Sequence, residues 1–169
     1  VDFGCGGGID VILAAQKAAP GATVVGIDFS PQMIQRAAES VAELGLSDRV
    51  KLIVSDLERT KLPDDFADLM ISNCVINLVP DKAAVYSEAF RILKPGGRLA
   101  ISDIVLADGT DPDLRARLRA ALSGCLGGSL PEDEYFGIVE DAGFHELDIV
   151  TRHVLTPKEL LAMSRCPGE

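Results

Sequence analysis

The stretch VDFGCGGGID, residues 1–10, decides the fold, because it places four glycines directly after a short apolar run that carries an acidic residue, Asp2. A strand that ends in glycines and continues into a helix is typical of nucleotide-binding turns. Glycine lets the backbone turn sharply and approach a ligand closely. The kind of nucleotide depends on the spacing of the glycines.

Two common nucleotide motifs do not match this stretch. The dinucleotide fingerprint G-x-G-x-x-G needs a third glycine, but Ile9 stands there counting from Gly4, and Val11 stands there counting from Gly6. A phosphate-binding loop needs a lysine directly after the glycines, and the first lysine is Lys17. The sequence therefore argues against both a dinucleotide and a nucleoside triphosphate.

The pattern that fits is D-x-G-x-G-x-G, formed by Asp2, Gly4, Gly6 and Gly8. A carboxylate at a strand end can accept hydrogen bonds from a positively charged group, which a sulfonium cofactor with an amino-acid tail provides. A second acidic residue, Asp28, follows an apolar run twenty positions after Gly8, where it can bind both ribose hydroxyls. Together these features predict a site for such a cofactor.

Composition limits the classes of protein that remain. A chain of 169 residues with 47% hydrophobic and 25% charged residues is typical of one globular domain. No apolar run approaches the roughly 18 residues of a membrane span, and no secretory signal begins the chain, so we expect a cytoplasmic protein without membrane contact. The net charge of −10 opposes binding to nucleic acid.

Apolar runs alternate with helical patterns along the chain, which indicates an α/β domain with a doubly wound, mostly parallel, Rossmann-like sheet. We expect a single domain over residues 1–169, cut at both ends, in which residues 107–143 form a helical insertion on the substrate side. The expected strands are 1–3, 23–27, 50–54, 67–72, 98–106 and 144–153, and the expected helices are 9–19, 31–44, 81–93, 111–125, 131–142 and a short one opened by a capping box at 156–159.

Over nearly its whole length the chain resembles the class I S-adenosylmethionine-dependent methyltransferases. The matching stretches are residues 2–8, 26–33, 55–57 and 93–97. The resemblance implies S-adenosyl-L-methionine as cofactor and contacts from the turn residues Asp2, Gly4, Gly6 and Gly8. It further places Asp28 on the ribose, Met33 at the adenine, and Asp56 with Leu57 at the adenine edge. Phe29 and Asn73 are also implied to bind the cofactor. Core packing is the alternative for Met33, and a solvated loop carboxylate is the alternative for Asp56.

Residues 72–82 and 90–103 resemble the arsenite methyltransferases more specifically. The resemblance assigns Cys74 and Cys125 as ligands of a trivalent arsenical, although by spacing alone a lone cysteine at the position of Cys74 is more often a buried apolar filler. Thiolates are soft ligands, and trivalent arsenic keeps a lone pair that can attack a methyl group without a general base. His145 and His153 are accordingly expected at the surface, and Cys5 and Cys166 are not expected to be ligands.

Members of that family that accept inorganic arsenite carry a third cysteine upstream of the glycine turn, and this chain begins after that point. Two thiols suffice for a methylated arsenical, which has two exchangeable positions. The implied partners are the arsenical, carried as a thiol conjugate, and an external thiol reductant.

Two alternatives stay open. One is a C- or O-methyltransferase for a small organic acceptor such as a quinone precursor, and the other is a non-catalytic module that binds the cofactor or a metalloid.

Overall fold

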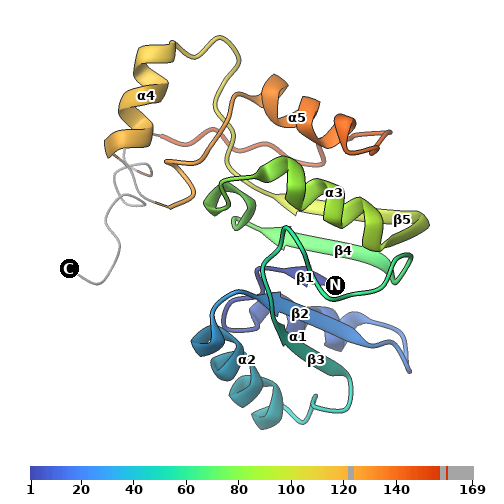
Figure 1. Ribbon diagram of the computed structural model, residues 1–169. Helices are drawn as coiled ribbons and strands as arrows, with labels where there is room; N and C mark the ends of the chain where they lie inside the picture. The colour runs from blue at the N-terminus through green and yellow to red at the C-terminus, as the bar shows by residue number, and fades with distance from the viewer. Residues whose placement is uncertain (122–123, 157–158, 160–169) are drawn as a thin grey trace.

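A parallel sheet in the order β3-β2-β1-β4-β5 forms the centre of the protein (Figure 1). The computed structural model describes residues 1–121, 124–156 and 159. The strands are β1 Asp2–Phe3, β2 Val24–Asp28, β3 Val50–Val54, β4 Ala67–Asn73 and β5 Leu93–Ser102. The strand order reverses at β1, which confirms the predicted doubly wound topology. In such sheets the crevice beyond the carboxyl end of the first strand is where ligands bind.

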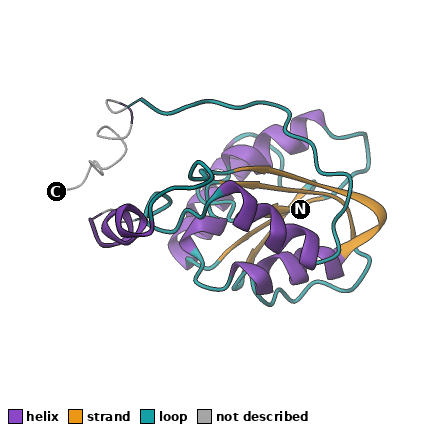
Figure 2. Cartoon of the chain, turned by 90° about the horizontal axis from the view of Figure 1, so that it is seen from above, coloured by secondary structure: helices purple, strands orange, loops and turns teal. Residues whose placement is uncertain are grey.

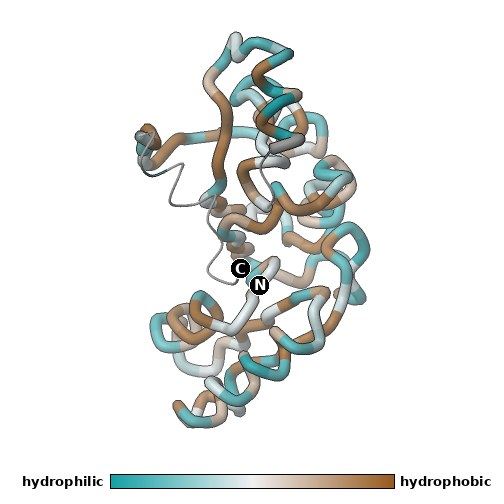
Figure 3. The backbone as a smooth tube through the Cα atoms, turned by 90° about the vertical axis from the view of Figure 1, so that its left-hand side faces the viewer, coloured by the Kyte–Doolittle hydropathy of each residue, from teal (hydrophilic) through white to brown (hydrophobic). Residues whose placement is uncertain are grey.

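Helices cover both faces of this sheet (Figure 2). They are α1 Ile9–Lys17, α2 Pro31–Glu43, α3 Lys82–Ile92, α4 Pro112–Ala121 and α5 Glu132–Asp141, with a short 3-10 helix, η1, at Ile76–Leu78. Neighbouring residues of β2 point to opposite faces, so Val24 packs in one apolar cluster with α1 and α2, whereas Val25 and Ile27 pack in another with α3 and α5. Hydrophilic and hydrophobic residues alternate along the helices (Figure 3), because each helix turns one face to the sheet and the other to the solvent.

Side chains cap the starts of three helices, close to residues 31, 81 and 111 where these helices are expected to begin. The Ser30 side chain accepts a hydrogen bond from the Met33 amide at 3.3 Å, with Pro31 at the first helical position. Asp81 caps α3 by accepting from the Ala84 amide at 2.9 Å. Asp111 caps α4 in the same manner.

The fifth strand differs from the expected range 98–106. It begins earlier, at Leu93, with a register shift between Ala67 and Leu69 of β4, and it ends at Ser102. The chain leaves the sheet there because the Asp103 carboxylate turns to accept hydrogen bonds from Asn77 and from the Ile104 amide. Residues 103–106 therefore belong to the candidate site rather than to the sheet.

The strand predicted for 144–153 is wrong. Among the described residues 144–156 no strand is formed, because no neighbouring strand lies beside this segment to accept its backbone hydrogen bonds. Phe144 packs against Phe90, but most of the apolar side chains that follow remain exposed, with Val150 at 91%. The capping box is confirmed, since Thr156 and Glu159 exchange hydrogen bonds, but the helix expected after it falls outside the described residues.

Within the described part of the chain, none of the helices is long and apolar enough to cross a bilayer.

Candidate functional site

The glycine turn after β1 leaves an open space at Gly6. Gly4 and Gly6 have φ angles of +72° and +49°, in the left-handed region that favours glycine. A Cβ atom added at Gly4 would lie 2.4 Å from the Val75 side chain, whereas one added at Gly6 would meet no atom within 4 Å. The turn is thus packed on the protein at Gly4 and accessible to a ligand at Gly6.

Asp28, at the end of β2, is bonded directly to this turn. Its side chain is buried, and its two oxygens accept hydrogen bonds at 2.9 Å from the Gly6 and Ser30 amides. A carboxylate has about four lone-pair sites, so capacity remains for ribose hydroxyls. The sequence predicts that Asp28 contacts the ribose, but it does not predict that Asp28 also holds the glycine turn through the Gly6 amide.

Asp2, at the end of β1, is a buried carboxylate with an unsatisfied oxygen. The residue is 2% exposed, and its Oδ2 has no hydrogen-bond partner. Burial raises the pKa of Asp2 to about 7, and the nearby carboxylates of Asp10 and Asp28 contribute in the same direction. A buried oxygen without a partner is costly, so the arrangement fits a cationic ligand group such as the amino group of S-adenosylmethionine.

The cofactor-binding residues expected after β2 and β3 differ in exposure. Phe29, just before α2, is 64% exposed, and Met33, in the first turn of α2, is 37% exposed, so Met33 is not part of the core. Asp56 is exposed, but the Leu57 side chain is buried in the same apolar cluster as Phe3. Contact between a ligand and Leu57 would therefore involve its backbone.

Asn73 stands at the carboxyl end of β4, on the far side of β1 from Asp28. Its Nδ2 donates to Asp10 Oδ2 at 3.3 Å, which links the end of β4 to the first turn of α1.

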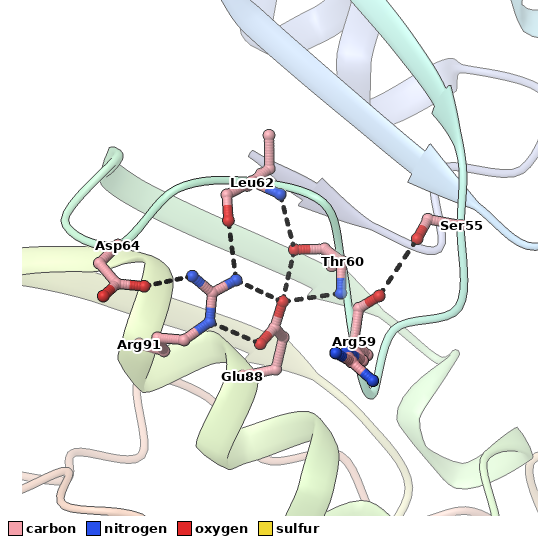
Figure 4. Close-up of polar contacts among 7 residues, drawn as sticks. All are labelled: Ser55, Arg59, Thr60, Leu62, Asp64, Glu88 and Arg91. Carbon is pink, nitrogen blue, oxygen red and sulfur yellow. Dashed lines mark hydrogen bonds and ion pairs between the residues drawn. The ribbon is translucent and has the colours of Figure 1, made fainter.

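A buried carboxylate in α3 holds the loop that carries Asp56 and Leu57 (Figure 4). Glu88 Oε1 accepts from the Thr60 amide at 2.7 Å and from its hydroxyl at 2.6 Å. Arg91 donates to both oxygens of Glu88 and to the Leu62 carbonyl.

Burial alone would raise the pKa of Glu88, but hydrogen bonds from Arg91 and Thr60 outweigh it and hold the pKa below its usual value. The sequence analysis did not identify Glu88, although its position in the helix is a signal. It lies three residues after Val85 and four before Ile92, which are both fully buried, so it shares their face of the helix.

The structure brings the two predicted arsenic ligands together. Cys74 follows β4 and has a φ of +57°, which is uncommon for a residue other than glycine. The Cys125 thiol donates to the Cys74 carbonyl at 2.6 Å. Burial, followed by the hydrogen bond with the Cys125 thiol, raises the pKa of Cys74 to about 12.

The other cysteines and the histidines lie elsewhere. Cys5 is buried in the apolar cluster of α1 and α2, and Cys166 lies outside the described residues. His145 and His153 are exposed, as predicted. Across the residues that the structure describes, no group of three or more His, Cys, Asp or Glu side chains is arranged to hold a metal ion.

A polar network fixes the segment after Cys74. Asn77 in η1 donates to Asp103 Oδ1 and to the Ile104 carbonyl, each at 2.7 Å. Tyr135 of α5 donates to Asp103 Oδ2 at 2.9 Å and accepts from Tyr86 of α3 at 2.7 Å. Burial raises the pKa of Asp103, and these hydrogen bonds oppose the shift.

The turn that carries Cys125 packs directly against η1. A Cβ atom added at Gly128 would lie 1.8 Å from the Asn77 carbonyl oxygen, so only glycine permits this approach. The close contact explains how two cysteines from separate elements meet. Sequence reasoning named the cysteines but missed Asn77, Asp103 and Gly128 as the residues that position them.

Comparisons with known proteins show the family of the chain. A family described as a methyltransferase domain matches residues 1–143. The arsenite methyltransferase of Halobacterium salinarum is 35% identical over 152 residues, which are 90% of this chain and 38% of that protein. Methyltransferase GfsG of Streptomyces halstedii is 34% identical over 150 residues, which are 88% of this chain and 53% of GfsG.

Among solved structures, an arsenic(III) S-adenosylmethionine methyltransferase from Chlamydomonas reinhardtii superposes with a TM-score of 0.75 and 34% sequence identity. The match covers 84% of this chain and 50% of that one. The chain thus spans about half, or less, of the proteins that it resembles.

Proposed function

The chain belongs to the methyltransferase domain family, and we propose on that basis that the protein transfers the methyl group of S-adenosyl-L-methionine to a small-molecule acceptor. When bound, this cofactor supplies an electrophilic methyl group. The unsatisfied oxygen of Asp2 would accept from its amino group, and the open backbone at Gly6 would allow it to approach. Asp28 would bind the ribose hydroxyls, and the exposed side chains of Phe29 and Met33 would contact adenine.

The acceptor that we propose is trivalent arsenic held by Cys74 and Cys125. The observation that carries this proposal is the contact between these two residues at the carboxyl end of β4, because two adjacent thiols can bind one thiophilic centre. The names of the relatives from Halobacterium and Chlamydomonas support arsenic as the substrate.

Binding of the arsenical is a thiol exchange. Each cysteine sulfur forms a bond to arsenic while one arsenic–sulfur bond to the carrier thiol breaks, and the cysteine proton leaves on the carrier thiol. The raised pKa of Cys74 means that this thiol carries its proton before the exchange. Two exchanges suit a monomethylated arsenical, and an external thiol reductant would keep arsenic trivalent.

The segment 107–143 completes the acceptor side, as we propose. It contains α4, α5 and the turn with Cys125, so it supplies one of the two thiols and, through Tyr135, part of the network around Asp103.

The test is methyl transfer from S-adenosylmethionine to a monomethylated trivalent arsenical in excess glutathione, with the intact protein. Cys74→Ser and Cys125→Ser should each remove nearly all activity, since a hydroxyl is a hard, protonated ligand that does not replace a thiolate. Cys5→Ser is the matched control and should retain activity. Full activity in either of the first two variants would refute the arsenic proposal.

A second candidate acceptor is a small organic molecule, and the name of another relative, Aklanonic acid methyltransferase DauC of a Streptomyces species, 33% identical over 132 residues, favours it. In that case Cys74 and Cys125 pack as ordinary thiols, and the double variant Cys74→Ser with Cys125→Ser should retain transfer to the organic acceptor. Cofactor binding without transfer to either kind of acceptor would instead indicate a non-catalytic binding module.

A further inference from the structure

A pocket of about 420 Å³ opens beside the cysteine pair, between η1, the beginning of α3, the end of α4 and the turn at residues 124–128. Among the residues that the structure describes, its charged lining residues are Lys82 and Arg119, and none of the lining residues is acidic. The glycines Gly124, Gly127 and Gly128 form one wall. Backbone of this kind, without side chains, allows a ligand to come close to the amide groups.

Lys82 is a buried cation without a carboxylate partner among the described residues. It is 8% exposed, and its Nζ donates to the Val79 carbonyl at 3.3 Å. An ammonium group has three donors, so this single weak contact leaves Lys82 largely unsatisfied. Burial lowers the pKa of Lys82, and the positive charge of Arg119 lowers it further, which places the two cations near each other.

Asp103 does not neutralise this pair by contact. Its charge raises the pKa of Lys82, but its hydrogen bonds come from Asn77, Tyr135 and the Ile104 amide, and among the described residues it forms no ion pair with Lys82. The free donors of Lys82 and the positive charge of Arg119 can therefore bind an anion from outside the chain in this pocket.

We propose that this pocket binds the anionic oxygens of a small molecule, a carboxylate or a phosphate group, between Lys82, Arg119 and the glycine wall. The bound anion lies next to the turn that carries Cys125, so the site anchors an acidic group of a molecule that reaches the cysteine pair. Arginine binds carboxylate and phosphate oxygens in a bidentate manner, and the lysine adds a point charge. The proposal stands independently of arsenic chemistry, because it requires neither the cofactor nor methyl transfer.

The experiment is a titration of the intact, isotope-labelled protein with inorganic phosphate and, separately, with succinate, followed through the amide resonances of Gly124, Gly127 and Gly128. Succinamide is the neutral control. We expect saturable shifts with at least one anion and none with succinamide. Tighter binding of phosphate or of succinate identifies which anionic group the pocket prefers.

Three variants locate the site. Arg119→Gln, which alters an exposed residue, should weaken anion binding about tenfold, the lower end for a charge-assisted hydrogen bond. Lys82→Met should weaken it at least as much, and its thermal melting shows whether it folds. Arg117→Gln removes the same charge from α4 outside the pocket and should leave binding unchanged.

The absence of saturable shifts with both anions would overturn the proposal. So would equal affinities in the Arg119→Gln and Arg117→Gln variants, since the effect would then be one of net charge. None of these readouts depends on methylation, so a failure here is distinct from a failure of the proposed function.

Discussion

The Cys125 thiol donates a hydrogen bond to the Cys74 backbone carbonyl over 2.6 Å, although the two residues are 51 positions apart. Cys74 adopts a left-handed backbone conformation at the same point, and such conformations in residues other than glycine concentrate at functional sites. The contact lies at the junction of β4 and η1, and this backbone conformation fits the proposed role of the two cysteines as one site.

Cys74 should react slowly with iodoacetamide at pH 8, measured by mass spectrometry of the alkylated peptide. Its pKa of about 12 lies well above the ordinary 9.0, which lowers the fraction of reactive thiolate by about a thousandfold. The greater nucleophilicity of a more basic thiolate offsets part of this, so alkylation at least about tenfold slower than that of free cysteine is expected. A rate equal to that of free cysteine would contradict the burial of this thiol.

Asp28→Ala should weaken binding of S-adenosylmethionine by about 1.5 to 3 kcal/mol, the range for hydrogen bonds to a charged group. The substitution also releases the Gly6 amide, so part of the loss reflects a looser turn. Asp28→Asn keeps one acceptor oxygen and should fall between the wild type and Asp28→Ala. Titration calorimetry gives the affinities, and an unchanged value in Asp28→Ala would remove the ribose assignment.

Gly6→Val and Gly4→Val form a matched pair. The Cβ atom of a valine at position 6 meets no protein atom within 4 Å and enters the ligand space, so we expect loss of cofactor binding with a folded protein that is destabilised by about 1–2 kcal/mol of backbone strain. Valine at position 4 collides with Val75, so we expect a much lower melting temperature. Normal cofactor binding by the Gly6→Val variant would show that the cofactor does not approach this turn.

The sequence predicts the sheet and most helices because local signals specify them. Ser30 with Pro31, Asp81 and Asp111 mark helix starts, and the observed starts agree. The strand expected at 144–153 is wrong because an alternating apolar pattern does not reveal whether a partner strand lies beside it.

The polar residues that position the site are harder to predict for the same reason. Glu88, Asp103 and Gly128 act through contacts with residues about 25 to 50 positions away, such as Thr60, Asn77 and Tyr135. Motifs show which residues carry chemistry, but only the folded chain shows which residues hold them.

Because of the raised pKa of Asp2, we expect the stability of the protein and its affinity for the cofactor to respond to pH in opposite directions. In the folded protein its pKa is about 7, against an ordinary value of 3.8. Between these two pH values, Asp2 therefore keeps its proton in the folded state and has lost it in the unfolded state. The stability contributed by the protonated form is present below about pH 4 and is lost as the pH rises through 7. A shift of this size corresponds to about 4 kcal/mol at most. Asp2→Asn, which carries no titrating proton, should remove this loss, and thermal melts between pH 5 and 8 measure it.

The affinity for the cofactor should depend on pH in the opposite direction to the stability, because the ionised carboxylate of Asp2 is the form that accepts a hydrogen bond from the amino group of S-adenosylmethionine. Affinity should therefore increase as the pH rises from 6 to 8, and binding at pH 6 should release close to one proton. Calorimetry in buffers of different ionisation enthalpy counts that proton. Asp2→Asn should bind more weakly at pH 8 and with no proton release from this group. If affinity is the same at pH 6 and pH 8 in the wild type and in this variant, then Asp2 does not contact the cofactor.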